Sequence, residues 1–383
     1  MTKTTVASPT IHLAGDIGAS ASKFFYRVHP GQAVPLWMDA AVANGLSESA
    51  LPSIVSKHRP QDSAWLEIGS EIVLVGESAK SFLNNTSLSA NKAEKAAYKI
   101  AAALGIIAEL EQLPSQYKAF IWLPLPLTEI RSREQIAAKF YDICEQGFRF
   151  REQQQDVQPI LKFFPEGFGL YLNRKKQLEK SGQSIAGRRT LILMMGHRNL
   201  SILCFEGGSL RAGRSNSDGP GFWSAFEKAT RSAGVPPSDY AGLMSALVTG
   251  KSQQISQAQA GLFDFGTYAN FVRQTYWQAV SVYLQDNLLG QLTDGSVDIL
   301  LSGGGSCIIQ SEIADYFESL GLSDSPAERH GQRLVYTDQL QPQLTDLVSQ
   351  LPEAAQNSSI PLRMSDCYGL FQGLIGKLTK VAA

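Results

Sequence analysis

Cysteine is scarce in this sequence, and the four cysteines stand far apart, at Cys144, Cys204, Cys307 and Cys367. No CxxC or CxxH spacing occurs, so the chain lacks the patterns of a disulfide framework and of a zinc site. We therefore expect buried, reduced thiols and no metal cage built from cysteine.

An excess of charge and a long hydrophobic run are missing as well. The 34 Lys and Arg residues nearly balance the 35 Asp and Glu residues, for a formal net charge of −1. The basic residues are scattered, which is not the electrostatic signature of direct nucleic-acid binding. No stretch approaches the ~18 apolar residues of a membrane span, and the N-terminal residues lack the apolar core of a signal peptide. We expect a cytoplasmic protein that contacts neither membrane nor nucleic acid directly.

Several catalytic motifs are also absent. The sequence has no GxSxG, no HExxH and no Walker phosphate loop, so it offers no support for a serine hydrolase, a zinc protease or a P-loop enzyme. What is present is ordinary for a soluble globular protein, with 44% apolar and 18% charged residues. A chain of 383 residues exceeds what one hydrophobic core usually supports, so we expect two or more packed subdomains.

Strands and helices are predicted to alternate, which favours an α/β architecture. A β-hairpin is expected over 11–28, two strands around Gly69 within 64–75, a helix over 91–110, a strand over 117–125, a helix over 132–145 and a strand over 157–164. The stretch 173–189 is charged and lacks apolar periodicity, and we predict a boundary between two lobes there.

After that stretch the first pattern returns, because apolar runs at 189–195 and 200–205 again predict a hairpin. This is a weak internal repeat. Helices are expected over 222–233, 238–249, 267–289, 307–320 and 365–379, with a buried strand over 297–301.

Two glycine-rich loops follow predicted strands. In GDIGAS, Asp16 could hold Mg²⁺ through its water shell, and the small residues after it leave room for backbone amides to approach phosphate oxygens. The alternative is a hairpin turn with an incidental acid. The second loop, SGGGS at 302–306, lies at a strand-to-helix junction, where ligands bind in α/β sheets, although three glycines could equally form a flexible turn. Together the two loops predict a ligand held between two lobes.

Three segments, GDIGASASK, MGHRN and LLSGGGS, occur in this order along the chain. They resemble the first phosphate loop, the second phosphate loop and the adenosine motif of the superfamily that joins actin, hexokinase and the heat-shock chaperone ATPases. Further segments resemble bacterial plasmid-segregating actins of the ParM/StbA kind: WLEIGSEIVLVGESA, FIWLPLPL, FFPEGFGLYL and SDCYGLFQGLIG. These matches occur in the expected order from residue 11 to residue 378.

This resemblance implies an α/β, two-lobed, actin-like (ribonuclease H-like) fold of duplicated domains with a nucleotide cleft between them. Lobe I would comprise 1–187, with a small inserted subdomain at about 31–110, and would be completed by the C-terminal helix 363–383. Lobe II would comprise 188–362. The implied cofactors are ATP or GTP with Mg²⁺, and the sequence does not distinguish the two bases.

The resemblance also implies roles for individual residues. Asp16 would help to hold Mg²⁺ through water, and Glu166 would orient the attacking water, although on spacing alone Glu166 could equally be a solvent-facing turn acid. The phosphates would be bound by Gly18, Ala19, Ser20, Ser22, Lys23, Gly196, His197, Arg198 and Asn199, and the adenosine by Gly303, Gly304, Gly305 and Ser306. Such a site suits phosphoryl transfer, where positioning and charge neutralisation do most of the work.

One departure concerns hydrolysis. The family's second phosphate loop normally starts and ends with an acid, whereas this sequence has Met194 and Ser201 at those places, so we expect a slow ATPase or GTPase. His197 and Arg198 could donate to phosphate there, Arg being the better partner, or they could form an exposed polar turn.

The leading functional hypothesis is a nucleotide-dependent, actin-like filament protein whose partner is a second copy of itself. The family implies plasmid or DNA segregation, or cytoskeletal positioning, with any contact to DNA made through a DNA-binding adaptor protein. Two alternatives stay open. One is a binding module that holds nucleotide with little or no hydrolysis and docks a partner. The other is a small-molecule kinase, which would need a carboxylate base that no recognisable motif supplies.

Overall fold

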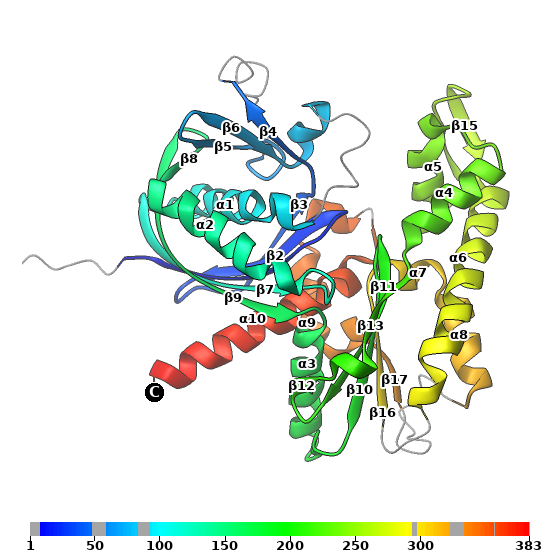
Figure 1. Ribbon diagram of the computed structural model, residues 1–383. Helices are drawn as coiled ribbons and strands as arrows, with labels where there is room; N and C mark the ends of the chain where they lie inside the picture. The colour runs from blue at the N-terminus through cyan, green and yellow to red at the C-terminus, as the bar shows by residue number, and fades with distance from the viewer. Residues whose placement is uncertain are drawn as a thin grey trace, which may run out of the picture. The chain divides into compact units, whose positions relative to one another are not determined.

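The computed structural model describes residues 8–47, 59–82, 92–292, 297–321, 333–355 and 357–382 (Figure 1). Its contacts divide into two compact units, Met1–Glu166 with Leu370–Ala383 as unit 1, and Gly167–Gly369 as unit 2. The lobes predicted from the sequence, with their boundaries at 187/188 and 362/363, stay a prediction about domain organisation. Within the described residues, no helix is long and apolar enough to cross a membrane.

Unit 1 is built on a nine-stranded mixed sheet in the order β3-β2-β1-β7-β9-β8-β5-β6-β4. Strand β1 pairs antiparallel with β2 and parallel with β7, and β7 continues parallel to β9. The strands are β1 (Thr10–Ile17), β2 (Ala21–Val28), β3 (Val34–Asp39), β4 (Val42–Leu46), β5 (Ala64–Ile68), β6 (Glu71–Val75), β7 (Gln116–Leu125), β8 (Phe148–Phe150) and β9 (Gln153–Pro165).

Two helices, α1 (Lys92–Leu110) and α2 (Arg133–Gln146), contact each other and strands of this sheet, and a 3-10 helix, η2 (Glu77–Phe82), contacts β4 and β6. Helix α1 is buried along most of its length from Ala96 to Ala108, which explains its run of alanines, because small side chains allow close approach on every face. Gly105 shows how close this is, since a Cβ there would collide with the ring of Phe150.

Unit 2 repeats this pattern on a smaller scale. Its main sheet has the order β12-β11-β10-β16-β17, with β13 paired to β11. As in unit 1, an antiparallel hairpin, β10–β11, is followed by parallel neighbours, β16 and then β17. The strands are β10 (Arg189–Met195), β11 (Asn199–Glu206), β12 (Ser209–Leu210), β13 (Asn216–Pro220), β16 (Val297–Ser302) and β17 (Arg333–Tyr336). The orders β3-β2-β1-β7-β9 and β12-β11-β10-β16-β17 therefore confirm the predicted internal repeat.

The helices of unit 2 are α3 (Phe168–Lys180), α4 (Phe222–Ser232), α5 (Tyr240–Thr249), α6 (Gly266–Asn287), α7 (Gly304–Ile308), α8 (Gln310–Ser319) and α9 (Pro342–Val348). Helix α6 packs against α4 and α5, and the short hairpin of β14 (Gln253–Ser256) and β15 (Gly261–Asp264) lies at the end of this group (Figure 1). The last helix, α10 (Ile360–Ala382), begins in unit 2, and its residues from Leu370 onward belong to unit 1.

The first part of the stretch 173–189, where we predict a boundary between two lobes, is helical. Helix α3 continues to Lys180, and Arg174 is only 1% exposed because its guanidinium forms an ion pair with Asp298. The local sequence cannot show this pairing, because Asp298 lies 124 residues further along the chain.

The four cysteines are unpaired with one another, as predicted. Cys144, Cys204 and Cys367 are buried, but Cys307 is only half-buried, because it lines a cavity described below.

Candidate functional site

The first loop, Gly18–Ser20, connects β1 to β2, and the register of this hairpin positions its charged residues. Asp16 and Lys23 are cross-strand partners, so their side chains meet, and Lys23 Nζ lies 2.5 Å from Asp16 Oδ2. Both side chains are largely buried, at 13% exposure for Lys23 and 12% for Asp16. Two residues predicted to act at the phosphates and Mg²⁺ are therefore brought together.

A second lysine, which the sequence analysis missed, reaches the same loop. Lys99 projects from α1, is 4% exposed, and donates from its ammonium nitrogen to the Gly18 carbonyl over 3.1 Å. Ser22, which follows the loop, is fully buried, and its hydroxyl has no hydrogen-bond partner among the described residues. No motif marks Lys99, because it lies 81 residues from Gly18 in an alanine-rich helix.

Glu166 follows β9 directly. Strands β1, β7 and β9 are parallel, so their carboxyl ends lie at one edge of the sheet, the edge at which ligands bind in α/β folds. The Glu166 amide donates to the Leu125 carbonyl over 2.9 Å, which fixes Glu166 at the end of β7. The topology therefore places Asp16, the first loop and Glu166 at the same edge.

The second loop, Gly196–Asn199, connects β10 to β11 in unit 2. Its ends are closed by a hydrogen bond of 2.9 Å from the Gly196 amide to the Asn199 carbonyl. Gly221, just before α4, packs so tightly on the loop that a Cβ would collide with the Arg198 backbone. The Asn199 side chain donates to the Ser217 carbonyl over 2.9 Å, so this amide holds the loop in shape.

Within the second loop, His197 and Arg198 differ. The imidazole of His197 packs against Trp223, with ring centroids 5.1 Å apart, and the Trp223 amide donates to the His197 carbonyl. Burial, and then the charges of Arg363 and Arg198, lower the pKa of His197 to about 4, so the ring is neutral at physiological pH. Arg198 is exposed and remains the charged donor of this loop.

Two uncharged residues occupy the positions at which the second phosphate loop of the resembled family has acids. Met194 and Ser201 are cross-strand partners in the β10–β11 hairpin, as Asp16 and Lys23 are in the β1–β2 hairpin. Ser201 is 1% exposed, and the Asn199 side-chain amide lies 3.3 Å from its hydroxyl. An ion pair in unit 1 thus corresponds to an uncharged pair in unit 2.

The glycine motif, Gly303–Ser306, begins where β16 ends. Gly303 has a φ of 91°, and a Cβ on it would collide with the Met195 carbonyl, so only glycine fits. Gly305 packs against Met195 and against the hydroxyl of Tyr276, a fully buried group without a hydrogen-bond partner among the described residues. The structure therefore brings the glycine motif against the strand end from which the second loop begins.

Arg363, from the first turn of α10, is a further residue that the sequence analysis missed. A Cβ on Gly304 would lie 3.3 to 3.6 Å from its side chain, so the arginine packs on the glycine motif. Its charge adds to the burial that lowers the pKa of His197 and opposes the burial that raises the pKa of Cys307, which indicates that it lies near the second loop as well. A guanidinium at this place suits a phosphate ligand.

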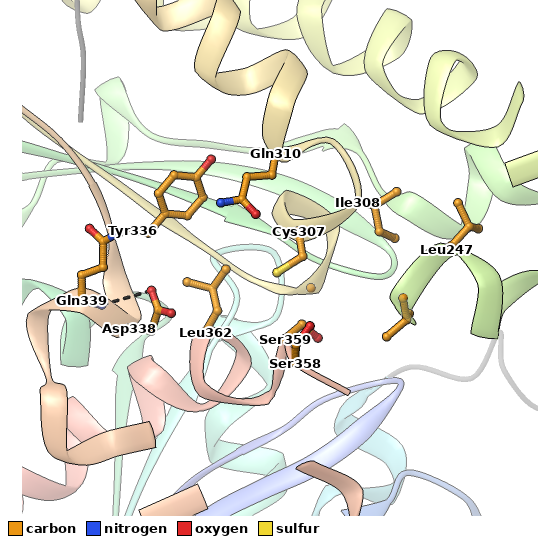
Figure 2. Close-up of a pocket in the computed structure, with 12 residues that line it drawn as sticks. Leu247, Cys307, Ile308, Gln310, Tyr336, Asp338, Gln339, Ser358, Ser359 and Leu362 are labelled. Atoms are coloured by element: carbon orange, nitrogen blue, oxygen red, sulfur yellow. Dashed lines mark hydrogen bonds between the residues drawn. The ribbon is translucent and has the colours of Figure 1, made fainter. Parts of the chain in front are cut away.

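A cavity of about 300 Å³ opens beside the glycine motif, and Figure 2 shows the side chains around it. This volume is at the lower end of the range for small-molecule sites. The lining residues come from α5, α7, β17, the first residue of α8, the first turn of α10, and the segments that follow β17 and precede α10. They are Leu247, Val248, Gly304, Cys307, Ile308, Gln310, Tyr336, Asp338, Gln339, Ser358, Ser359 and Leu362. Burial raises the pKa of Cys307 to about 11, so its thiol is protonated at neutral pH.

Within the described residues, no group of three or more His, Cys, Asp or Glu side chains could hold a metal ion by itself. Mg²⁺ keeps most of its waters and usually takes one or two carboxylates together with substrate phosphates. Asp16 is an oxygen ligand of the right kind for such a site. Ser22 is the cross-strand partner of Ile17, so its buried hydroxyl lies on the other face of the hairpin from Asp16.

Comparison with known proteins shows a shared fold at low sequence identity. No protein-family model and no curated protein matches the chain. Among solved structures, the actin-like protein Alp7A matches at a TM-score of 0.64 and 12% identity, over 97% of this chain and 98% of that one. The ParM protein of psk41 in its apo form matches at 0.60 and 13%, over 97% and 98%. A 15-stranded ParM filament from Clostridium botulinum matches at 0.60 and 14%, over 96% and 99%.

These matches run over nearly the whole chain, so the protein has an actin-like, ParM-type α/β fold, and the predicted fold class is confirmed. Identity of 12 to 14% supports a shared fold and carries no information on individual residues. The roles predicted for the residues of both loops and of the glycine motif stay predictions.

Proposed function

We propose that this chain is a nucleotide-dependent, actin-like filament protein that acts in plasmid or DNA segregation or in cytoskeletal positioning. The observation that carries the proposal is the duplicated hairpin, with a tight loop at the carboxyl end of a parallel strand in each unit. Support comes from the full-length likeness to actin-like proteins, one of which was solved as a filament.

The ligand would be a purine nucleoside triphosphate with Mg²⁺. Lys23 and Lys99 supply positive charge at the first loop, and Arg198 and Arg363 supply it around the second loop and the glycine motif. Bound Mg²⁺ neutralises charge on the phosphates, and Asp16 is the residue that would hold it through water.

Hydrolysis would depend on Glu166, because the second loop contributes no acid. With Met194 and Ser201 opposite each other, the loop end of that hairpin has no carboxylate that could orient water. We therefore propose a slow ATPase or GTPase, in which Glu166 orients the attacking water at the edge that it shares with Asp16.

The uncharged Met194–Ser201 pair also favours a second candidate, a module that binds nucleotide without hydrolysing it and docks a partner. Phosphate release with Mg-ATP and Mg-GTP separates the two, using wild type and the variants Asp16→Ala and Glu166→Gln. A filament ATPase or GTPase loses phosphate release in both variants, whereas equal release by all three proteins refutes the site.

Self-association is tested by sedimentation. Wild type should pellet with Mg-ATP or Mg-GTP and stay in the supernatant without nucleotide, and Asp16→Ala should stay in the supernatant in both conditions. Wild type that remains monomeric at high protein concentration with both nucleotides refutes the filament. In cells, a DNA-binding adaptor protein would connect such a filament to DNA, because the chain's charge is near neutral.

A further inference from the structure

We propose that the cavity beside the glycine motif takes a guanine base, and that Asp338 selects guanine over adenine. The inference rests on the proposed function, because it concerns the base of the nucleotide whose phosphates the loops would bind. It adds the choice between GTP and ATP, which the sequence leaves open.

The walls of the cavity combine apolar side chains with a neighbouring positive charge, as a purine nucleotide requires. Leu247, Val248, Ile308 and Leu362 give it apolar sides, against which a flat aromatic base can pack. Gly304 lines the same cavity, and the Arg363 side chain packs on Gly304. The positive charge that would bind phosphate therefore lies next to the cavity. A nucleotide with its phosphates near Arg363 and the second loop can therefore extend its base into this space.

The polar side chains of the cavity determine which edge of the base can form hydrogen bonds with the protein. Gln310, Asp338 and Gln339 contribute side chains to the lining, and Figure 2 shows Asp338 beside Gln339 and Leu362. Asp338 lies in η8 (Thr337–Leu340), the 3-10 turn at the carboxyl end of β17. It is therefore fixed at the same edge of the sheet as the glycine motif, because β16 and β17 are parallel.

The Asp338 carboxylate retains acceptor capacity. Its Oδ1 accepts a hydrogen bond of 3.0 Å from the Gln339 amide. Among the described side chains no Lys, Arg or His forms an ion pair with it. Asp338 is half-buried in the cavity lining, so a ligand that donates to it gains more than at an exposed acid, and the same burial raises the pKa of this carboxyl.

Guanine and adenine differ at the edge that such a carboxylate can bind. Guanine presents two adjacent donors, N1–H and the N2 amino group, which match the two oxygens of a carboxylate. Adenine presents one amino donor beside N1, and N1 is an acceptor that repels the second oxygen. A carboxylate can only accept, whereas the glutamine amides can turn to donate or accept and so do not discriminate. Asp338 is thus the group in the lining that favours guanine.

Calorimetric titration of the full chain with Mg-GTP, Mg-ATP, Mg-ITP and Mg-XTP tests the proposal. GTP should bind roughly 10- to 100-fold more tightly than ATP, the range expected for one good bidentate contact. ITP, which lacks the 2-amino group, should fall between them. Asp338→Asn should lose most of its affinity for GTP and gain affinity for XTP, whose 2-oxygen can accept from the asparagine amide.

Asp346→Asn is the matched control, because Asp346 is an exposed acid on the neighbouring helix α9 and does not line the cavity. It should bind all four nucleotides as wild type does. The gain of XTP binding in Asp338→Asn cannot come from a misfolded protein, so it separates recognition from loss of structure.

Three results overturn the proposal. Wild type could prefer ATP or bind both nucleotides equally, which leaves the proposed function intact and removes the guanine assignment. Asp338→Asn could weaken GTP and ATP to the same extent without gaining XTP, which places the acid at the ribose or in the fold. Wild type that binds none of the four triphosphates refutes both the guanine assignment and the proposed function.

Discussion

The ion-pair cluster around Asp298 gives the sharpest prediction for stability. Asp298 lies near the start of β16, the strand that ends at the glycine motif, and is fully buried. Arg174 donates to its two oxygens over 3.0 and 2.7 Å, and Arg188 over 3.1 and 2.8 Å. Burial alone would raise the pKa of Asp298, but the hydrogen bonds from Arg174 and Arg188 outweigh it and hold the pKa below its ordinary value.

Asp298→Asn keeps the size of the side chain and removes its charge, which leaves two guanidinium groups without a counter-ion. Breaking one partner of a buried pair typically costs about 3–5 kcal/mol. For a cooperative unit of this size, each kcal/mol lowers Tm by roughly 2–4 °C, so unit 2 should lose roughly 6–20 °C. Thermal unfolding followed by circular dichroism and calorimetry measures the shift.

Glu227→Gln is the control, because Glu227 pairs at 3.6 Å with Arg231 on the exposed face of α4, where such a pair contributes about 0.3–0.5 kcal/mol. Its Tm should stay near that of wild type. If Asp298→Asn unfolds within about 2 °C of Glu227→Gln, the buried cluster does not hold unit 2 together and the reasoning fails.

Three further predictions concern the loops, the glycine motif and pH. Lys99→Met should weaken the binding of Mg-nucleotide about 10-fold or more in calorimetry, because a hydrogen bond from a charged donor contributes about 1.5–3 kcal/mol. Unchanged affinity would contradict a role for Lys99 at the first loop. Gly303→Ala should lower Tm and abolish binding, because of its φ of 91° and the Met195 carbonyl, whereas Gly376→Ala, with open space around it, should be neutral or stabilising. Stability should fall as pH drops from about 6.5 toward about 4. In the unfolded chain His12 takes up a proton near its ordinary pKa of 6.5, whereas in the folded chain burial, and then Arg27 and His29, lower its pKa to about 4. His12→Gln should flatten that part of a plot of Tm against pH, and a plot that keeps its slope would refute this origin.

Local patterns predicted the hairpins, most helices and the position of both loops. The runs at 117–125 and 297–301 became β7 and β16 because a strand that is largely buried needs a nearly continuous apolar sequence, which Lys118 and Asp298 interrupt only once each. The internal repeat could be recognised for the same reason, because each hairpin consists of two short apolar runs joined by a turn of small or polar residues.

What local patterns could not show is contact between distant residues. Arg174 and Arg188 counted toward a predicted lobe boundary, because their charge can be read locally and their partner Asp298 lies far along the chain. Lys99, Arg363 and Asp338 were missed at the candidate site for the same reason, as each reaches it from an element far from the loop that it serves. Only the fold brings such residues together.

Negative-stain microscopy of the purified chain, with and without Mg-GTP and Mg-ATP, tests the central claim most directly. The account predicts filaments with nucleotide, dispersed particles without it, and dispersed particles in both conditions for Asp16→Ala. Dispersed particles under every condition, or filaments that form equally well without nucleotide and in Asp16→Ala, would contradict it.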